Sequence, residues 1–168
     1  MLRTNHYDCA FEAYLRRARC SYVAVDETRR ALLAEVSLKS VDFVVTGGSI
    51  NRLVDIKGRR FPSGPTGTGA TWENWVTRDD IDSLTEWQKT FGAGFRSALV
   101  FAYHIVNESS RSQHSELFEF HGRTYAFYGV EVEPFAAVMR QRSPKWGTVS
   151  LPADQYRQLR TPFREWLR

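Results

Sequence analysis

Two β-rich runs joined by a turn-forming segment constrain the fold of this chain more than any other feature. The runs are VDFVVT at 41–46 and RLVDIK at 52–57, and Gly-Gly-Ser-Ile-Asn lies between them. Such runs around a short glycine-containing turn are typical of a β-hairpin. A second pair of runs, at 117–121 and 124–130, flanks Gly122 in the same way. Two hairpins exclude a helical bundle and favour a mixed sheet flanked by helices.

Apolar residues at helical spacing predict the helices that cover this sheet. Thr77 and Asp80 have the spacing of a capping box at the start of one of them. The segment 26–35 has no clear pattern, and the Gly/Pro-rich segment 61–71 predicts a mobile loop. The expected helices span 6–20, 78–91, 131–142 and 152–167, and the remaining expected strands span 21–25, 97–106 and 146–151. The predicted order is α-β-β-β-α-β followed by β-β-α-β-α, an α/β (α+β) fold in a single domain, 1–168.

Composition is that of a soluble globular protein with a basic surface. The 168 residues are 42% hydrophobic, and the formal charge of +4 with a pI near 9.3 favours a polyanionic partner. No apolar run is long enough to span a membrane, and the first residues do not resemble a signal peptide. Cys9 and Cys20 fall in one predicted helix, about 16 Å apart, which is too far for a disulfide. We therefore expect reduced thiols in a cytoplasmic protein without membrane contact.

The first hairpin brings acidic side chains together. Asp55 and Lys57 share one face of their strand, and the turn places Asp42 of the neighbouring strand close to them. Directly opposite residues on paired strands have Cβ atoms about 5 Å apart, a separation at which two carboxylates can hold one divalent cation. A neighbouring lysine can orient a metal-bound water or stabilise charge on a phosphoryl group.

A second interpretation of these residues stays open at this point. An aspartate and a lysine two positions apart on a strand are commonly a solvated face with a modest ion pair. Asp42 lies in an apolar run and is aligned with Asp55 by the hairpin. With this third residue, the pattern favours a metal site and an ion pair equally.

The pattern as a whole resembles the PD-(D/E)xK nuclease superfamily. Glu12 on an early helix, Asp42 in SVDFVV and the acid–x–lysine of LVDIKG follow the superfamily order, and the layout is most similar to archaeal-type Holliday-junction resolvases. The resemblance covers residues 6–106 and implies a restriction-endonuclease-like core, with 107–168 as a C-terminal β-β-α-β-α extension of unknown role. Val41 stands where the superfamily usually has proline, and aspartate replaces the commoner glutamate before the lysine.

This resemblance implies roles for individual residues. Asp42 and Asp55 would bind Mg²⁺ or Mn²⁺ with help from the Ile56 carbonyl, and Glu12 would be a further acid, bound directly or through water. Lys57 would be the catalytic lysine. The implied function is a metal-dependent endonuclease that hydrolyses nucleic-acid phosphodiesters, DNA in particular. Enzymes that cut two strands symmetrically commonly pair, so a homodimer is compatible with the resemblance.

Arginines near the predicted site and on the first helix are candidates for phosphate contacts. Arg59 and Arg60 directly follow the lysine, and Arg16 and Arg17 form a basic end to the first predicted helix. Such contacts give salt-dependent binding without sequence preference. Each arginine is also compatible with an ordinary solvated charge.

Two other functions are compatible with the same residues. One is a catalytically inactive nuclease-fold module that binds nucleic acid or serves an assembly. The other is a basic α/β protein in which Asp55 and Lys57 are only a structural ion pair. Binding of a divalent cation separates the enzyme from both alternatives.

Overall fold

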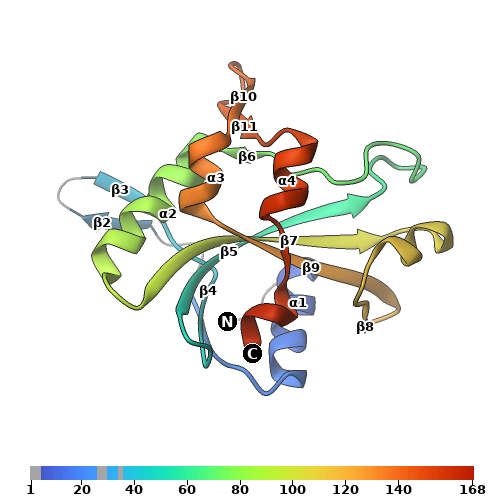
Figure 1. The fold of residues 1–168 in the computed structure, drawn as a ribbon, viewed down its shortest axis with the longest axis horizontal. Coiled ribbons are helices and arrows are strands. Elements are labelled where there is room, and N and C mark those ends of the chain that lie inside the picture. The colour runs from blue at the N-terminus through green and yellow to red at the C-terminus, as the bar shows by residue number, and fades with distance from the viewer. Residues whose placement is uncertain (1–4, 26–29, 34–35) are drawn as a thin grey trace.

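A mixed β-sheet forms the centre of the molecule (Figure 1). The computed structural model describes residues 5–25, 30–33 and 36–168. The strand order is β1-β4-β5-β7-β9-β12, with β8 paired to β9 at one end. The strands of this sheet are β1 (Ser21–Ala24), β4 (Phe43–Thr46), β5 (Asn51–Phe61), β7 (Phe95–Ile105), β8 (Phe118–Phe120), β9 (Arg123–Glu131) and β12 (Thr161–Pro162).

The long strands β5 and β7 run parallel through the middle of this sheet, from the pair Asn51–Phe95 to the pair Phe61–Ile105. On its other side β7 pairs antiparallel with β9, so the sheet is mixed, as the hairpin pattern predicts. The apolar run of β7 is buried from Ser97 to Tyr103 because neighbouring strands and layers on both faces enclose it. The α/β fold class and the central strand expected at 97–106 are confirmed.

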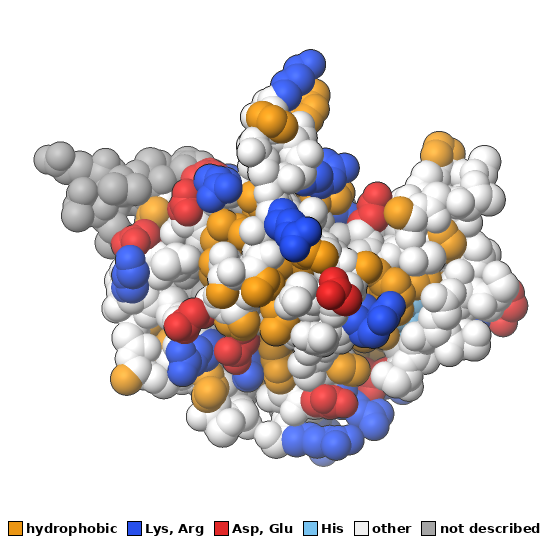
Figure 2. Space-filling model, turned by 45° about the horizontal axis from the view of Figure 1, so that its top comes forward, with side chains coloured by type: hydrophobic (Ala, Val, Ile, Leu, Met, Phe, Trp, Pro, Cys, Tyr) orange, Lys and Arg blue, Asp and Glu red, His pale blue; other side chains and the backbone are white. Residues whose placement is uncertain are grey.

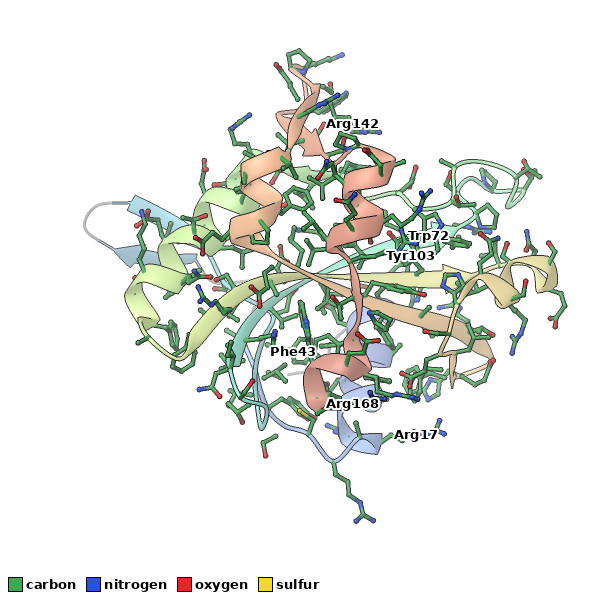
Figure 3. The ribbon with its side chains drawn as sticks, viewed as in Figure 1. Arg17, Phe43, Trp72, Tyr103, Arg142 and Arg168 are labelled. Carbon is green, nitrogen blue, oxygen red and sulfur yellow. The ribbon has the colours of Figure 1, made fainter. Side chains whose placement is uncertain are left out.

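Helices cover the two faces of the sheet and form two separate cores. Helix α1 (His6–Arg17) packs on one face, while α2 (Arg78–Phe91), α3 (Val132–Val138) and α4 (Ala153–Leu159) pack on the other (Figure 1). Phe43 belongs to the α1 core and Tyr103 to the opposite core (Figure 3). The helix at 78–91 is confirmed with its cap at Thr77, and the helix expected at 6–20 is present with its cap at Asn5 but ends at Arg17.

Strand β5 contributes to both cores because its side chains alternate between the faces. Leu53 packs with the core on the α2 side, and Val54 and Ile56 pack with α1. At Gly58 an added Cβ would overlap the ring of Tyr7, so the glycine allows α1 to approach the strand closely. The residues of β5 on the α2 side are therefore separated from α1 by the sheet itself.

Smaller elements are attached to this frame. Strand β2 (Arg30–Leu33), which lies within the segment 26–35 that has no clear pattern, pairs with β3 (Val36–Lys39) directly after that segment. A second small sheet has the order β10-β11-β6, and its β10–β11 hairpin projects from the body of the molecule (Figures 1 and 2). The bounds are β6 (Val76–Thr77), β10 (Arg140–Ser143) and β11 (Thr148–Ser150), and the 3-10 helices are η1 (Glu108–Gln113) and η2 (Phe163–Leu167).

The C-terminal part differs from expectation in two places. The helix expected at 131–142 ends at Val138, because residues 140–143 form β10 and pair with β11. The helix expected at 152–167 is divided into α4, β12 and η2, since Pro162 has no N–H to donate and restricts the residue before it. Residues 107–168 are also integral to the central sheet, because they supply β9 and β12.

Two simpler expectations concern thiols and membrane spans. Neither Cys9 nor Cys20 forms a disulfide, and Cys20 lies beyond the end of α1 rather than in the same helix as Cys9. Within the described ranges, none of the helices is long and apolar enough to cross a membrane.

Candidate functional site

The register of β4 on β5 brings Asp42 and Asp55 together. Phe43 lies opposite Val54, and the main-chain N–H of Asp42 donates to the Val54 carbonyl at 2.8 Å, which places Asp42 beside Asp55. The Asp42 carboxylate is buried and accepts the main-chain N–H of Ile56 at 2.6 Å. The hairpin therefore holds this carboxylate in a fixed position next to the second acid.

The two carboxyl groups of this pair interact directly. Burial raises the pKa of Asp55, and the negative charge of Asp80 raises it further, against the opposing effects of Lys57 and of a hydrogen bond with Asp42. A hydrogen bond between two carboxyl groups requires a proton on one of them. A divalent cation can replace such a proton, because it also neutralises two neighbouring carboxylates.

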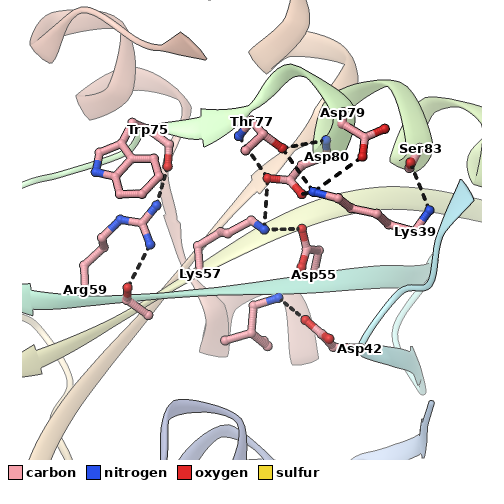
Figure 4. A network of polar contacts seen from close by, with 12 residues as sticks. Lys39, Asp42, Asp55, Lys57, Arg59, Trp75, Thr77, Asp79, Asp80 and Ser83 are labelled. Atoms are coloured by element: carbon pink, nitrogen blue, oxygen red, sulfur yellow. Dashed lines mark hydrogen bonds and ion pairs between the residues drawn. The ribbon is translucent and has the colours of Figure 1, made fainter. Parts of the chain in front are cut away.

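Lys57 lies between two acids. Its Nζ is 2.9 Å from Oδ2 of Asp55 and 3.0 Å from Oδ2 of Asp80, and 18% of its side chain is exposed (Figure 4). Burial lowers the pKa of Lys57, but the two carboxylates outweigh burial and leave the pKa above its usual value. The ammonium is therefore charged at neutral pH and fixed beside Asp55.

Asp80 and Lys39 belong to the site although the sequence did not assign them to it. The sequence identifies Asp80 only as the partner of Thr77 in a capping box, and that box is present. The same carboxylate also binds Lys57 and, through Oδ1, Lys39 at 2.9 Å. Burial opposes ionisation, but Lys57, Lys39 and Thr77 together lower the pKa of Asp80 to about 2. The sequence holds no clue to this role, because Lys57 and Lys39 come from separate strands.

These side chains surround one open pocket. Its volume is about 330 Å³, and its wall contains three aspartates and two lysines (Figure 4). The pocket lies between the first hairpin, the end of β3 and the first two turns of α2. Its lining residues are Lys39, Ser40, Asp42, Asp55, Lys57, Asp80, Ser83 and Leu84.

Glu12, the further acid that the resemblance implies, lies elsewhere. It is on α1, which packs on the opposite face of the sheet, and it does not line the pocket. Its Oε1 accepts the hydroxyl of Tyr22 at 2.9 Å and a guanidinium N–H of Arg16 at 3.1 Å. In the part of the chain that the structure describes, no three His, Cys, Asp or Glu side chains are grouped as a metal site. Of the three aspartates in the pocket, Asp42 and Asp55 are neighbours, whereas Lys57 lies between Asp55 and Asp80.

The predicted phosphate-binding arginines are distributed over both faces. Arg59 stacks on Trp75, with its guanidinium carbon 4.0 Å from the ring centroid, and it donates to the carbonyls of Trp75 and Gly58. Burial lowers the pKa of Arg59. The next residue, Arg60, is exposed. Only Arg59 is therefore fixed beside the pocket.

Arg16 and Arg17 lie at the C-terminal end of α1. Arg16 pairs with Glu12, and the guanidinium carbon of Arg17 is 5.7 Å from the ring centroid of Phe118. Both are exposed. Because α1 packs on the opposite face of the sheet, these two arginines are separated from the pocket.

Comparison with known proteins shows a similarity of structure. Neither a family model nor a curated protein matches the chain. Among solved structures, it is similar to that of Archaeoglobus fulgidus Hjc, a Holliday junction resolvase from an archaeal hyperthermophile. The TM-score is 0.56 at 11% sequence identity, and the similarity covers 95% of this chain and 96% of the other. The chain therefore has the restriction-endonuclease-like fold of this resolvase, and the shared fold extends well into residues 107–168.

Proposed function

We propose that this protein is a metal-dependent nuclease that hydrolyses phosphodiester bonds in DNA. The observation that carries the proposal is the Asp42–Asp55 pair with Lys57 fixed beside it in an open pocket. The similarity to a Holliday junction resolvase supports the proposal, because acid–x–lysine stands here on the hairpin of a nuclease fold. The excess of basic residues, a net charge of +4, is suited to a polyanionic substrate.

The donors in the pocket fit a hard divalent cation. Mg²⁺ and Mn²⁺ prefer oxygen ligands, and Mg²⁺ usually keeps several waters while one or two carboxylates hold it. Asp42 and Asp55 would supply the carboxylates, and the Ile56 carbonyl is the nearest main-chain candidate for a third ligand. When bound, the cation would polarise a phosphodiester and make a water more acidic.

The protein's own side chains would act on the substrate in separate ways. The Lys57 ammonium would stabilise the negative charge that develops on the phosphoryl oxygens, since it is charged and largely desolvated. Asp80 would keep Lys57 in position when Asp55 binds the cation, because the Asp80 carboxylate lies 3.0 Å from the same ammonium. Arg59 would bind a neighbouring phosphate from its place on Trp75.

A second function is favoured by one specific observation. The ammonium of Lys57 is already paired with two carboxylates, and Glu12 lies on the other side of the sheet. A pocket in that state could belong to a nuclease-fold module that binds nucleic acid without cleaving it. The two functions differ in turnover and in dependence on a divalent cation.

A cleavage assay separates the two functions. End-labelled four-way junction, linear duplex, single-stranded DNA and RNA would each be incubated with the protein and Mg²⁺, Mn²⁺ or excess chelator. Metal-dependent cleavage of a DNA substrate that is lost in Asp55→Asn supports the nuclease. DNA binding without cleavage in either metal contradicts it and supports the binding module. Light scattering of the same preparation tests the proposed homodimer.

A further inference from the structure

The projecting β10–β11 hairpin, residues 140–150, is strongly basic. Arg140, Arg142 and Lys145 are all exposed, and no Asp or Glu occurs from Pro134 to Ala153. The space-filling view shows basic side chains on this projection, clear of the body of the molecule (Figure 2). By contrast, the exposed Arg164 near the C-terminus has a carboxylate partner, Glu116, at 3.0 Å. The hairpin therefore concentrates positive charge without neighbouring acids in its own sequence.

The tip of the hairpin carries an exposed indole. Trp146 is 69% exposed, the highest value among the large hydrophobic side chains of the described residues. The ammonium of Lys145 is 5.2 Å from the centroid of its ring. An exposed tryptophan is costly to leave in water, and a ring next to a cation is suited to stacking on a base whose phosphate the cation binds.

The hairpin is joined to the wall of the pocket. Thr148 of β11 pairs with Thr77 of β6, and the Gly147 carbonyl accepts the main-chain N–H of Arg78 at 2.9 Å. Thr77 is the cap of α2 that also binds Asp80. The position of the hairpin relative to the pocket is thus set by β-sheet pairing and by the same helix terminus that holds the pocket.

Cationic side chains lie between the pocket and the β10–β11 hairpin. The guanidinium carbon of Arg142 is 5.0 Å from the ring centroid of Trp75, whose ring also carries Arg59. Arg59 follows Lys57 by two residues on β5, so both side chains lie on the same face of the sheet. Figure 3 labels Arg142 on the hairpin, and Figure 4 shows Arg59 and Trp75 beside Lys57. Arg59 and Arg142, which share the ring of Trp75, therefore connect the edge of the pocket with the basic hairpin.

We propose that this hairpin is a nucleic-acid-binding arm. Its three exposed cations, Arg140, Arg142 and Lys145, bind backbone phosphates of the strand that leaves the pocket, and Trp146 stacks on an unpaired base. The part of this proposal that concerns the strand leaving the pocket rests on the proposed nuclease function. Binding by the arm can be measured without cleavage. Nucleic acid fits better than an acidic protein because the indole provides a surface for a base, which an acidic peptide does not have.

Fluorescence anisotropy in excess chelator tests the arm. A triple variant, Arg140→Gln/Arg142→Gln/Lys145→Gln, is compared with a control of equal charge loss, Lys89→Gln/Arg96→Gln/Arg168→Gln, on exposed positions outside the arm. The arm variant is expected to lose about tenfold or more in affinity for duplex and single-stranded DNA of one sequence. For duplex DNA, the slope of log affinity against log salt should fall by up to about 3 in the arm variant. In the control variant, the changes in log affinity and in this slope should each be at most about a third of those in the arm variant.

The tip residue gives a second, independent readout. Trp146→Ala is expected to lower affinity for single-stranded DNA by roughly 5- to 100-fold and to leave duplex affinity within about twofold. Because Trp146 is exposed, this substitution does not disturb the core.

The possible outcomes separate the arm from the nuclease. An arm variant that loses binding supports the arm even if the wild-type protein cleaves nothing. An arm variant that binds and cleaves like the charge-matched control overturns the arm and leaves the nuclease intact. Absence of wild-type binding to DNA overturns the arm. The proposal is also overturned if poly-glutamate competes with DNA for the protein as well as unlabelled DNA does and Trp146→Ala leaves DNA affinity unchanged. Those results together indicate an acidic protein partner.

Discussion

The two faces of β5 show how one strand serves two purposes. On the α2 side, Asp55 and Lys57 open into a polar pocket, while on the α1 side Val54 and Ile56 pack into an apolar core. The alternation of a single strand therefore separates chemistry from packing. An acid on α1, such as Glu12, lies against the face that the sheet shields from the pocket.

The acids on the two faces also differ in their electrostatic surroundings. Asp55 is paired with Asp42 and Lys57, and burial raises its pKa. Glu12 is bound by a tyrosine hydroxyl and an exposed arginine. A buried carboxyl group with perturbed ionisation is typical of functional sites, and Asp55 on the α2 face is such a group. Substitutions on the two faces are thus expected to affect different properties.

The largest effect is expected from Asp55→Asn. Cleavage should fall at least about 100-fold, because the substitution removes a charged group from the acid pair. The free energy of unfolding should stay the same or rise at pH 7, because a carboxylate whose folded pKa is raised costs folding energy when it ionises. The contrasting variant is Val54→Ala on the α1 face, which should lose roughly 1 to 3 kcal/mol of stability and keep its cleavage rate. A parallel loss of stability and activity in Asp55→Asn would contradict the separation of the two faces.

The next effect concerns Asp80 and pH. Its folded pKa of about 2 lies below the usual 3.8, which corresponds to roughly 2 kcal/mol of stability. This contribution is present above pH 4 and is lost as the pH falls through the folded pKa. Asp80→Asn should therefore be less stable than wild type by about this amount at pH 7, and the difference should shrink toward pH 2. Urea denaturation at several pH values measures it.

Asp79 provides the matched control for this measurement. It precedes Asp80 on the same helix turn, but half of its side chain is exposed and its contact with Lys39 is longer, 3.5 Å. Asp79→Asn should change stability by less than about 1 kcal/mol at any pH. Equal effects of the two substitutions would assign the stabilisation to the helix terminus as a whole.

The smallest effect is expected from Glu12→Gln. The amide keeps a hydrogen-bond acceptor for Tyr22 and loses the ion pair with the exposed Arg16. Cleavage should stay within about threefold of wild type, and stability within about 0.5 kcal/mol. A loss of cleavage comparable to that of Asp55→Asn would mean that Glu12 acts in the reaction despite its place on the other face.

Local patterns predicted the elements whose partners are close in sequence. The hairpin of β4 and β5 and the capping box at Thr77 depend on residues a few positions apart, and both are present. The β10–β11 hairpin was missed although its strands are close in sequence, because residues 131–142 have a helical pattern of apolar residues. The pairing of β11 with β6 was missed because these strands are far apart in sequence.

The same distinction holds for the candidate site. Asp42 and Asp55 could be placed together because hairpin register relates them directly. The role of Asp80 could not, because it depends on α2 returning to the sheet after a loop of more than ten residues. The position of Glu12 depends on which face α1 covers, a property that helical periodicity alone does not determine.

The measurement that tests the central claim most directly is a calorimetric titration with Mn²⁺ and Mg²⁺. The account predicts about one bound ion per chain in wild type, no binding in Asp42→Asn and Asp55→Asn, and retained binding in Glu12→Gln. Binding should weaken at low pH, because the carboxylates must be ionised to bind the cation and burial raises the pKa of Asp55. Absence of binding in wild type, or loss of binding in Glu12→Gln equal to that in Asp55→Asn, would contradict the account.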